Sequence, residues 1–176
     1  MNPVEASASS AEKILLAATD LFAANHFNGV SIKEIAKKSG VNSALISYYF
    51  GGKKNLYQEV LNEQSNLFLN LIARVSSKDI APLAKLREDI TAMAEVQKLH
   101  PHRIQLIYRE LLTPTVMCDS FIKNRLYKIH KFMSELVTEA IADGSIRNNM
   151  QPTHVAFTLE SIIVFFFLTH DQIRDL

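Results

Sequence analysis

Hydrophobic residues recur at helical spacing through most of the chain, and the strict alternation of apolar and polar residues that marks a strand is nearly absent. The first segment has one apolar stripe at this spacing, formed by Ile14, Leu15, Ala18, Leu21 and Phe22. Ser9 stands three residues before Glu12, which is the spacing of a capping box at the start of a helix. The pattern predicts an amphipathic helix over Ala11–Asn25, with Asn28 and Gly29 after its end.

Two short helices are predicted next, separated by a tight turn that contains a glycine. A second capping box begins at Ser31 and opens the first of them, which Gly40 ends. Asn42 or Ser43 can cap the second, which runs to about Phe50. Two short helices joined by such a turn are the signature of a helix-turn-helix, whose second helix enters the major groove of DNA.

The inward-facing positions of both helices also fit this motif. Ala36 is small where the second helix crosses the first, and glycine suits a left-handed backbone in the turn. The positions that hold the two helices together are Ile35, Ala36, Gly40, Val41 and Ile46. Such a match can arise by chance in a helical protein, but the preceding helix and the cap at Ser31 argue against chance. We therefore predict a helix-turn-helix over Ile32–Phe50.

The rest of the chain is predicted to be helical as well. A long helix over Lys53–Arg74 leads to a polar joint at Ser76–Ala81. Later helices are predicted over Pro82–Leu99, Pro101–Leu112, Pro114–Asp143 and Pro152–His170. The expected fold class is all-α, with a three-helix DNA-binding domain in residues 1–56 and a second helical domain in residues 57–176.

The net charge of the whole chain does not indicate DNA binding, but the distribution of charge along it does. The chain of 176 residues has a formal net charge of only +1. Residues 31–54, however, carry five lysines and one glutamate, a net +4, whereas residues 1–30 carry one lysine and three acids, a net −2. A basic segment in a nearly neutral chain fits a surface that contacts phosphates, although a solvated lysine-rich helix would have the same charge.

The sequence gives little support to several other classes of protein. Cys118 is the only cysteine, so the chain can form no intrachain disulfide and no cysteine-based zinc site, which fits a reducing cytoplasm. The N-terminus lacks the pattern of a signal peptide, and the longest apolar run, Ile162–Leu168, is shorter than the roughly 18–20 residues that span a bilayer. No metalloprotease motif, phosphate-binding glycine loop or nucleophile elbow is present. We expect a cytoplasmic protein that is not an enzyme, needs no cofactor or metal, and does not bind membranes.

Two segments resemble a known family. The runs Gly29–Val41 and Tyr48–Tyr57 are similar to the TetR/AcrR family of bacterial regulators, and the resemblance is specific over roughly residues 10–60. Arg109–Thr115 resembles a segment of the CecR-like branch. The resemblance implies a transcriptional regulator, usually a repressor, that binds a palindromic operator as a homodimer and is released by a small-molecule effector. Its two recognition helices would enter successive major grooves about 34–36 Å apart.

The resemblance also implies which residues contact DNA. Those expected to do so are Ser31, Asn42, Ser43, Ala44, Ser47, Tyr48, Tyr49 and Lys53. Amide and hydroxyl groups can bond base edges, and Ala44 can contact a thymine methyl, whereas Ser31 and Lys53 are placed for phosphates. No arginine stands in this helix, so we expect DNA shape to supply part of the specificity. Many relatives carry Lys, Gly and Tyr at positions 43, 44 and 47, so the operator should differ from theirs.

The second domain offers residues for two further roles that the resemblance implies. Candidate ligand-pocket residues are His102, Tyr108, Arg109, Phe121 and His130. The last helix is apolar on nearly every side, which requires burial on every side, so part of it should pair with a second subunit. Candidate dimer residues are Phe157, Ile162, Phe165 and Phe166. Family members pair two final helices with their symmetry mates, and this sequence ends at Leu176, directly after the first of the two. We therefore expect a short member of the family, a truncated chain, or a chain that lacks the closing helix. An enzyme and a protein-binding adaptor remain the alternatives.

Overall fold

The computed structural model describes residues 9–173, apart from the side chains of residues 102, 103, 122 and 171–173. Helices form this part of the chain, and no strand occurs in it. The elements are α1 (Ser10–Ala24), the 3-10 turn η1 (Phe27–Gly29), α2 (Ile32–Ser39), α3 (Ser43–Phe50), α4 (Lys53–Ser76), α5 (Pro82–Leu99), α6 (Pro101–Leu112), α7 (Cys118–Phe121), the π-helical η2 (Ile122–Leu126), α8 (Tyr127–Ala142) and α9 (Pro152–Ile173). The prediction of an all-α fold is confirmed.

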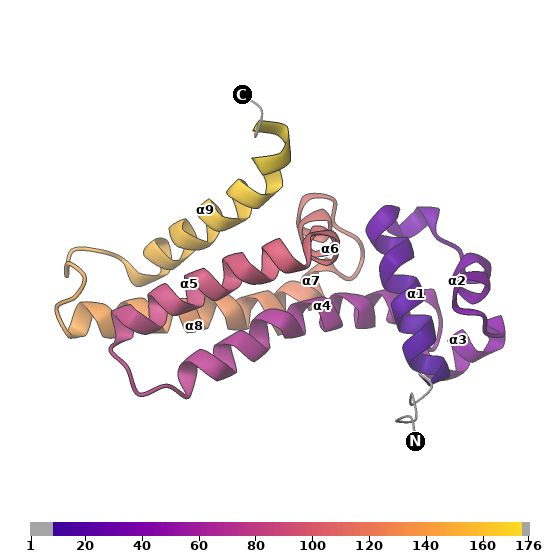
Figure 1. Ribbon diagram of the computed structural model, residues 1–176, viewed down its shortest axis with the longest axis horizontal. Coiled ribbons are helices and arrows are strands. Elements are labelled where there is room, and N and C mark those ends of the chain that lie inside the picture. Colours follow the sequence, from indigo (N-terminus) through magenta and orange to yellow (C-terminus); the bar gives the residue numbers. More distant parts are fainter. Residues whose placement is uncertain (1–8, 174–176) are drawn as a thin grey trace, which may run out of the picture.

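The molecule is elongated, with two groups of helices joined by one long helix (Figure 1). Helices α1, α2 and α3, which we call the head, lie at one end. Helices α5, α6, α8 and α9, which we call the body, lie at the other. Helix α4 starts in the head, where it packs on α1 and α3, and continues along α5 and α8 of the body. A displacement of α4 would therefore act on both parts.

Local signals in the sequence set the helix ends in the head. In both predicted capping boxes the serine hydroxyl accepts from the backbone N–H three residues on, Ser9 from Glu12 and Ser31 from Glu34, at 3.2 Å in each case. The left-handed backbone at Gly40, with φ of 69°, ends α2 and turns the chain into α3. A side chain at this position would be strained, so glycine is the residue that the turn requires.

The core explains how the helices are held together. Ile35 of α2 and Ile46 of α3 are fully buried, as the motif predicts, and they pack in one cluster with Phe22 of α1 and Leu56 of α4. The same cluster continues along α4 into the body, where Met133 of α8 is fully buried. Burial of each such side chain stabilises the fold by about 1.5–3 kcal/mol.

One predicted helix is wrong. The chain does not form a continuous helix over Pro114–Asp143, because a turn occupies its first residues and the π-helical η2 interrupts it before α8. The turn is held by Glu110, whose carboxylate Oε1 accepts from the backbone N–H of Thr115 at 3.0 Å and from its hydroxyl at 2.8 Å. These two bonds hold Thr115 in a turn and so compete with helix formation there. Glu110 lies outside Pro114–Asp143, so the pattern within that segment could not reveal the contact.

Candidate DNA-binding surface and ligand cavity

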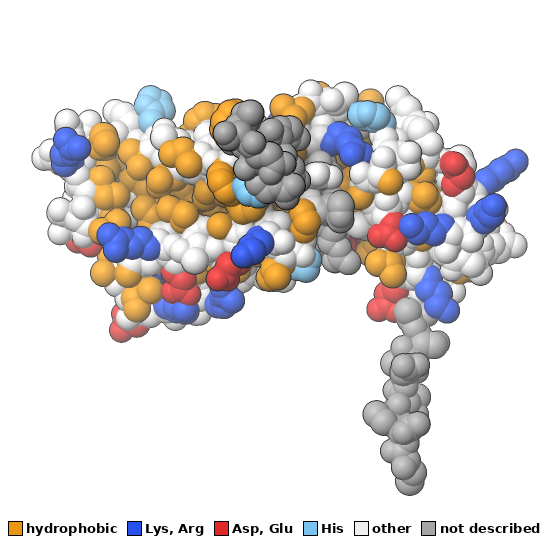
Figure 2. Space-filling view, turned by 45° about the horizontal axis from the view of Figure 1, so that its top comes forward, with side chains coloured by type: hydrophobic (Ala, Val, Ile, Leu, Met, Phe, Trp, Pro, Cys, Tyr) orange, Lys and Arg blue, Asp and Glu red, His pale blue; other side chains and the backbone are white. Residues whose placement is uncertain are grey.

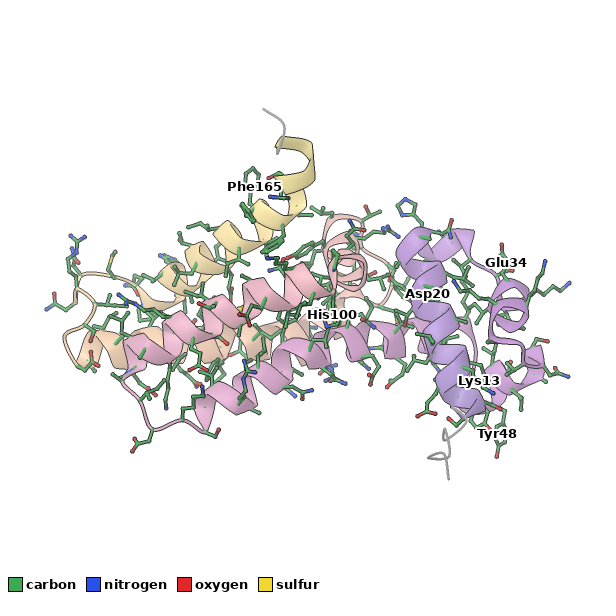
Figure 3. All side chains as sticks on the ribbon, viewed as in Figure 1. Lys13, Asp20, Glu34, Tyr48, His100 and Phe165 are labelled. Carbon is green, nitrogen blue, oxygen red and sulfur yellow. The ribbon has the colours of Figure 1, made fainter. Side chains whose placement is uncertain are left out.

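The residues predicted to read DNA lie together on one exposed face of the head. Asn42, Ser43, Ala44, Ser47 and Tyr49 are exposed, and Tyr48 is 79% exposed. Tyr48 projects from the outer tip of the head (Figure 3). Asn42 caps α3, because its side-chain oxygen accepts from the N–H of Ala44 at 2.9 Å. Its amide N–H groups are left for another acceptor, such as a base edge.

Two further positions border this face. Ser31 lies at the start of α2, where its hydroxyl donates to the Glu34 carboxylate at 2.7 Å. Lys53 begins α4, with its ammonium group 4.3 Å from the centre of the Phe27 ring. Partial burial lowers the pKa of Lys53, while the charge of Glu34 opposes this shift.

Besides the charge of Lys53, the backbone at the start of α4 favours binding of an anion. The residue before it is Gly52, at φ of 114°, and no side chain caps the first N–H groups of the helix. Uncapped N–H groups and the positive end of the helix dipole attract phosphate, and the ammonium of Lys53 adds to this attraction.

A contact that the sequence did not reveal joins the body to the head. Arg109 of α6 donates from one guanidinium nitrogen to the carbonyls of Phe22 and Asn25, at 2.8 and 2.9 Å. Its other terminal nitrogen donates to the carbonyl of Ala23 at 2.9 Å. Helix α1 has no basic residue in its own last turn, so Arg109 supplies the positive charge that its carbonyl end favours. We call this contact the Arg109 bridge.

The next residue links α6 to α4. Glu110 is fully buried, and its Oε2 accepts from the Tyr57 hydroxyl of α4 at 2.9 Å. The Tyr57 ring packs edge-on against Phe22 of α1, with 4.8 Å between centroids. Burial, and then the charge of Glu110, raises the pKa of Tyr57, so this phenol remains a hydrogen-bond donor. The segment that begins at Arg109 therefore holds α6, α1 and α4 at one junction.

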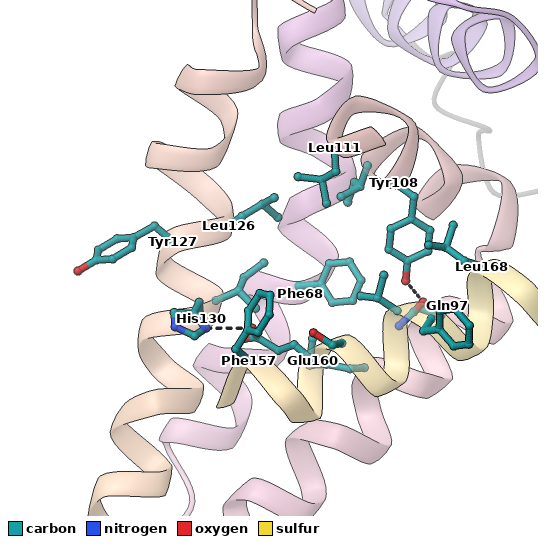
Figure 4. A pocket seen from close by; sticks show the side chains of 16 residues that line it. Phe68, Gln97, Tyr108, Leu111, Leu126, Tyr127, His130, Phe157, Glu160 and Leu168 are labelled. Atoms are coloured by element: carbon teal, nitrogen blue, oxygen red, sulfur yellow. Dashed lines mark hydrogen bonds and ion pairs between the residues drawn. The ribbon is translucent and has the colours of Figure 1, made fainter. Parts of the chain in front are cut away.

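The body contains a cavity of about 670 Å³, partly open to solvent, between α4, α5, α6, α8 and α9 (Figure 4). Its lining residues are Phe68, Met93, Gln97, Ile107, Tyr108, Leu111, Leu126, Tyr127, Ile129, His130, Phe157, Glu160, Ser161, Val164, Phe165 and Leu168. Four of the polar side chains in this wall form two pairs. The Tyr108 hydroxyl donates to the Gln97 side-chain oxygen, and His130 Nδ1 lies 2.9 Å from Glu160 Oε2. An apolar cavity with a few polar groups is the usual form of a small-molecule site.

The candidate pocket residues are therefore divided between different places. Tyr108 and His130 line the cavity, whereas Arg109 does not, because its guanidinium is held at the end of α1. Phe121 does not line it either, because its side chain is fully buried in the core. The side chain of His102 lies outside the described residues.

Helix α9 leaves a broad apolar face uncovered. One side of it packs on α8 and α5, but Phe157, Ile162, Phe165 and Phe166 are exposed, with Phe165 at 66%. Hydrophobic side chains gather over this part of the body in Figure 2. Phe157 and Phe165 also line the cavity, so two of the expected dimer residues belong to its rim.

By length and composition, α9 could also cross a bilayer. Residues Pro152–His170 have a mean hydropathy of 1.5 and are the one described segment that meets this test. The expectation from the longest apolar run overlooked this, because the run counted only uninterrupted apolar residues.

Comparison with known proteins agrees with this arrangement. Residues 14–60 match the model of the bacterial regulatory proteins of the tetR family. The regulator RutR of Escherichia coli K12 is 29% identical over 146 residues, which are 83% of this chain and 68% of RutR. The structure of HlyIIR, a hemolysin II transcriptional regulator, is 30% identical with a TM-score of 0.72 and covers 95% of this chain and 92% of its own.

A further solved structure, that of AibR in complex with isovaleryl coenzyme A and operator DNA, has a TM-score of 0.77 at 24% identity, and the match covers 90% of this chain and 86% of AibR. At that identity it supports the fold alone. The motif in the head, the family match that spans it and the similarity to HlyIIR over nearly the whole chain lead to one conclusion. The chain belongs to the TetR family of bacterial regulatory proteins.

Proposed function

We propose that this protein is a ligand-responsive transcriptional repressor that acts in the cytoplasm, with residues 1–56 binding the operator and residues 57–176 binding the effector and a second subunit. The observation that carries the proposal is the exposed face of α3, joined through the Arg109 bridge to a body that holds an apolar cavity. The assignment to the CecR-like branch stays part of the proposal, since it rests on the segment Arg109–Thr115 alone. No catalytic role is proposed.

On the operator, we expect α3 to lie in the major groove. Asn42, Ser43 and Ser47 offer hydrogen-bonding groups to base edges, while Ser31 and Lys53 flank them at two helix starts and would fix the register on phosphates. A hydroxyl of Ser31 that turned to a phosphate would give up its bond to Glu34, so this contact should be weaker than that of Lys53.

The exposed face of α9 is the proposed dimer surface. A second copy would cover Phe157, Ile162, Phe165 and Phe166, and each large apolar side chain buried contributes about 1.5–3 kcal/mol. Insertion into a bilayer is less favourable, because α9 already packs on α8 and carries Glu160, paired with His130 of that helix.

Effector binding would reach the head through α6 and α4. Three consecutive residues of α6 face three different partners: Tyr108 lines the cavity, Arg109 holds the end of α1, and Glu110 holds Tyr57 of α4. A ligand that displaces Tyr108 would shift α6 and, with it, the angle between head and body. The half-site spacing of the dimer then changes. This is allosteric only if the ligand binds the two arrangements with different affinity.

The test uses duplexes that the protein itself selects from a random DNA library. We expect Tyr48→Ala and Lys53→Ala to weaken binding to the selected duplex by tenfold or more while leaving the melting temperature nearly unchanged. The matched control for the lysine is Lys128→Ala, an exposed lysine of the body that does not line the cavity, and it should bind as the wild type does.

Salt gives a second readout of the same proposal. A protein that contacts several phosphates loses affinity steeply as salt rises, and Lys53→Ala should reduce that slope by about one. Selected duplexes that bind both head variants normally, or with no dependence on salt, would contradict the proposed surface.

A further inference from the structure

The cavity wall has an unusual balance of charge for so apolar a site. Its lining residues, among those the structure describes, include Glu160 and His130 but no lysine or arginine. The Tyr108 hydroxyl donates to Gln97, whereas the ionisable pair contains the one lining atom, among the described residues, that is buried without a hydrogen-bond partner, Glu160 Oε1.

Glu160 is the incompletely paired member. Its Oε2 lies 2.9 Å from His130 Nδ1, but its Oε1 is buried and has no hydrogen-bond partner among the described groups. A buried carboxylate oxygen without a donor costs about 1–3 kcal/mol or more. Such an atom in the wall of a cavity is suited to a ligand that brings positive charge or a donor.

A second carboxyl group lies behind it. Asp89 of α5 is only 2% exposed, and the charge of Glu160 acts on it directly. Burial, and then this repulsion, raises the pKa of Asp89 to about 6, and burial raises that of Glu160 as well. A second buried carboxyl group thus lies within electrostatic range of Glu160, although it does not itself line the cavity.

The aromatic lining favours the same kind of ligand. The rings of Phe68, Phe157 and Phe165 lie in the cavity wall, together with Tyr108 and Tyr127. The faces of aromatic rings attract cations. An anion would meet the carboxyl group of Glu160 and no arginine or lysine among the lining residues, and a neutral apolar molecule would leave Glu160 Oε1 unsatisfied.

We infer that the effector is a lipophilic cation, an apolar and largely aromatic or aliphatic body whose positive group lies against Glu160. The cation would hold Glu160 in its ionised form and supply the positive charge that His130 alone does not. Binding of such a cation follows from the chemistry of the cavity alone. Only its role as an effector that releases DNA rests on the proposed function.

Two probes of nearly the same shape separate the possibilities. Tetraphenylphosphonium is a permanent cation and tetraphenylborate a permanent anion, so neither changes its charge with pH. Binding of each to the full chain, measured by isothermal titration in a sodium buffer, should favour the cation by about tenfold or more. Equal affinities, or a preference for the borate, would overturn the inference without any need for a variant.

Glu160→Gln then assigns the preference to one residue. Glutamine keeps an oxygen for His130 but removes the charge, so the preference for the cation should fall by about tenfold. Glu139→Gln, at an exposed position on α8, is the matched control and should keep it. A folded Glu160→Gln protein, checked by its melting curve, that retains the full preference would also overturn the inference.

Operator binding is measured separately, so that the two proposals can fail independently. Cation-selective binding that depends on Glu160 but leaves operator affinity unchanged supports the inference and contradicts release by an effector. If the protein prefers the anion but still binds its operator, the proposed regulatory function is supported and the proposed cationic ligand is contradicted.

Discussion

The Arg109 bridge offers the sharpest test of how head and body are joined. Arg109→Met keeps most of the apolar stem of the side chain and removes the three hydrogen bonds to the carbonyls of Phe22, Ala23 and Asn25. The last turn of α1 contains no basic residue of its own to replace this contact. We expect the protein to be less stable and α1 to pack less tightly on α6.

The magnitude follows from the exposure of the contact. Hydrogen bonds from a charged donor contribute about 1.5–3 kcal/mol each when they are buried. Here the bond to Asn25 is exposed and the other two are partly buried, so water can replace much of what is lost. We expect a net loss of about 2 kcal/mol in the free energy of unfolding. For a chain of this length that corresponds to a melting temperature lower by about 4–8 °C.

The assay combines thermal unfolding with amide hydrogen exchange. Exchange should accelerate in the last turn of α1, because that turn loses its tertiary support, and stay unchanged in α3. Arg125→Met is the matched control: Arg125 donates to the side chains of Asn62 and Asn66 of α4 at 3.2 and 2.9 Å but does not contact the head.

The result could refute the reasoning in two ways. A melting temperature within about 1 °C of the wild type would show that the three hydrogen bonds contribute little. Faster exchange in α1 for Arg125→Met, to the same degree as for Arg109→Met, would show that the effect is a general loosening of the body rather than loss of the bridge.

Three other variants test the fold and the charges. Because burial raises the pKa of Asp89 from 3.8 to about 6, its ionisation destabilises the native state as pH rises from about 4 to about 6. Asp89→Asn should therefore gain about 2 kcal/mol on the wild type between pH 4 and pH 7 in urea unfolding, and parallel pH curves would refute this. Gly40→Ala should cost about 1–2 kcal/mol through its left-handed backbone, so an unchanged urea midpoint would contradict that strain. Ile162→Ser with Phe166→Ser should convert the proposed dimer to monomer in sedimentation, and a persistent dimer would place the interface elsewhere.

Much of the head could be predicted because its signals are local. Capping boxes, a glycine in a left-handed turn and apolar residues at helical spacing each act within a few residues, and each fixes a helix end or a buried face on its own. The predicted bounds of α2 and α3, and the burial of Ile35 and Ile46, agree with the structure for this reason.

The sequence by itself thus determined the fold class, the motif and the face of α3 that remains exposed. Only the tertiary structure decided where Arg109 and Glu110 point, since their partners are far away: the Phe22 carbonyl is 87 residues from Arg109, and Tyr57 is 53 residues from Glu110. The cavity was decided in the same way, because its wall combines side chains from five helices and no stretch of sequence contains it. Local periodicity shows which face of a helix is buried, but the residue that it meets there depends on how distant helices pack.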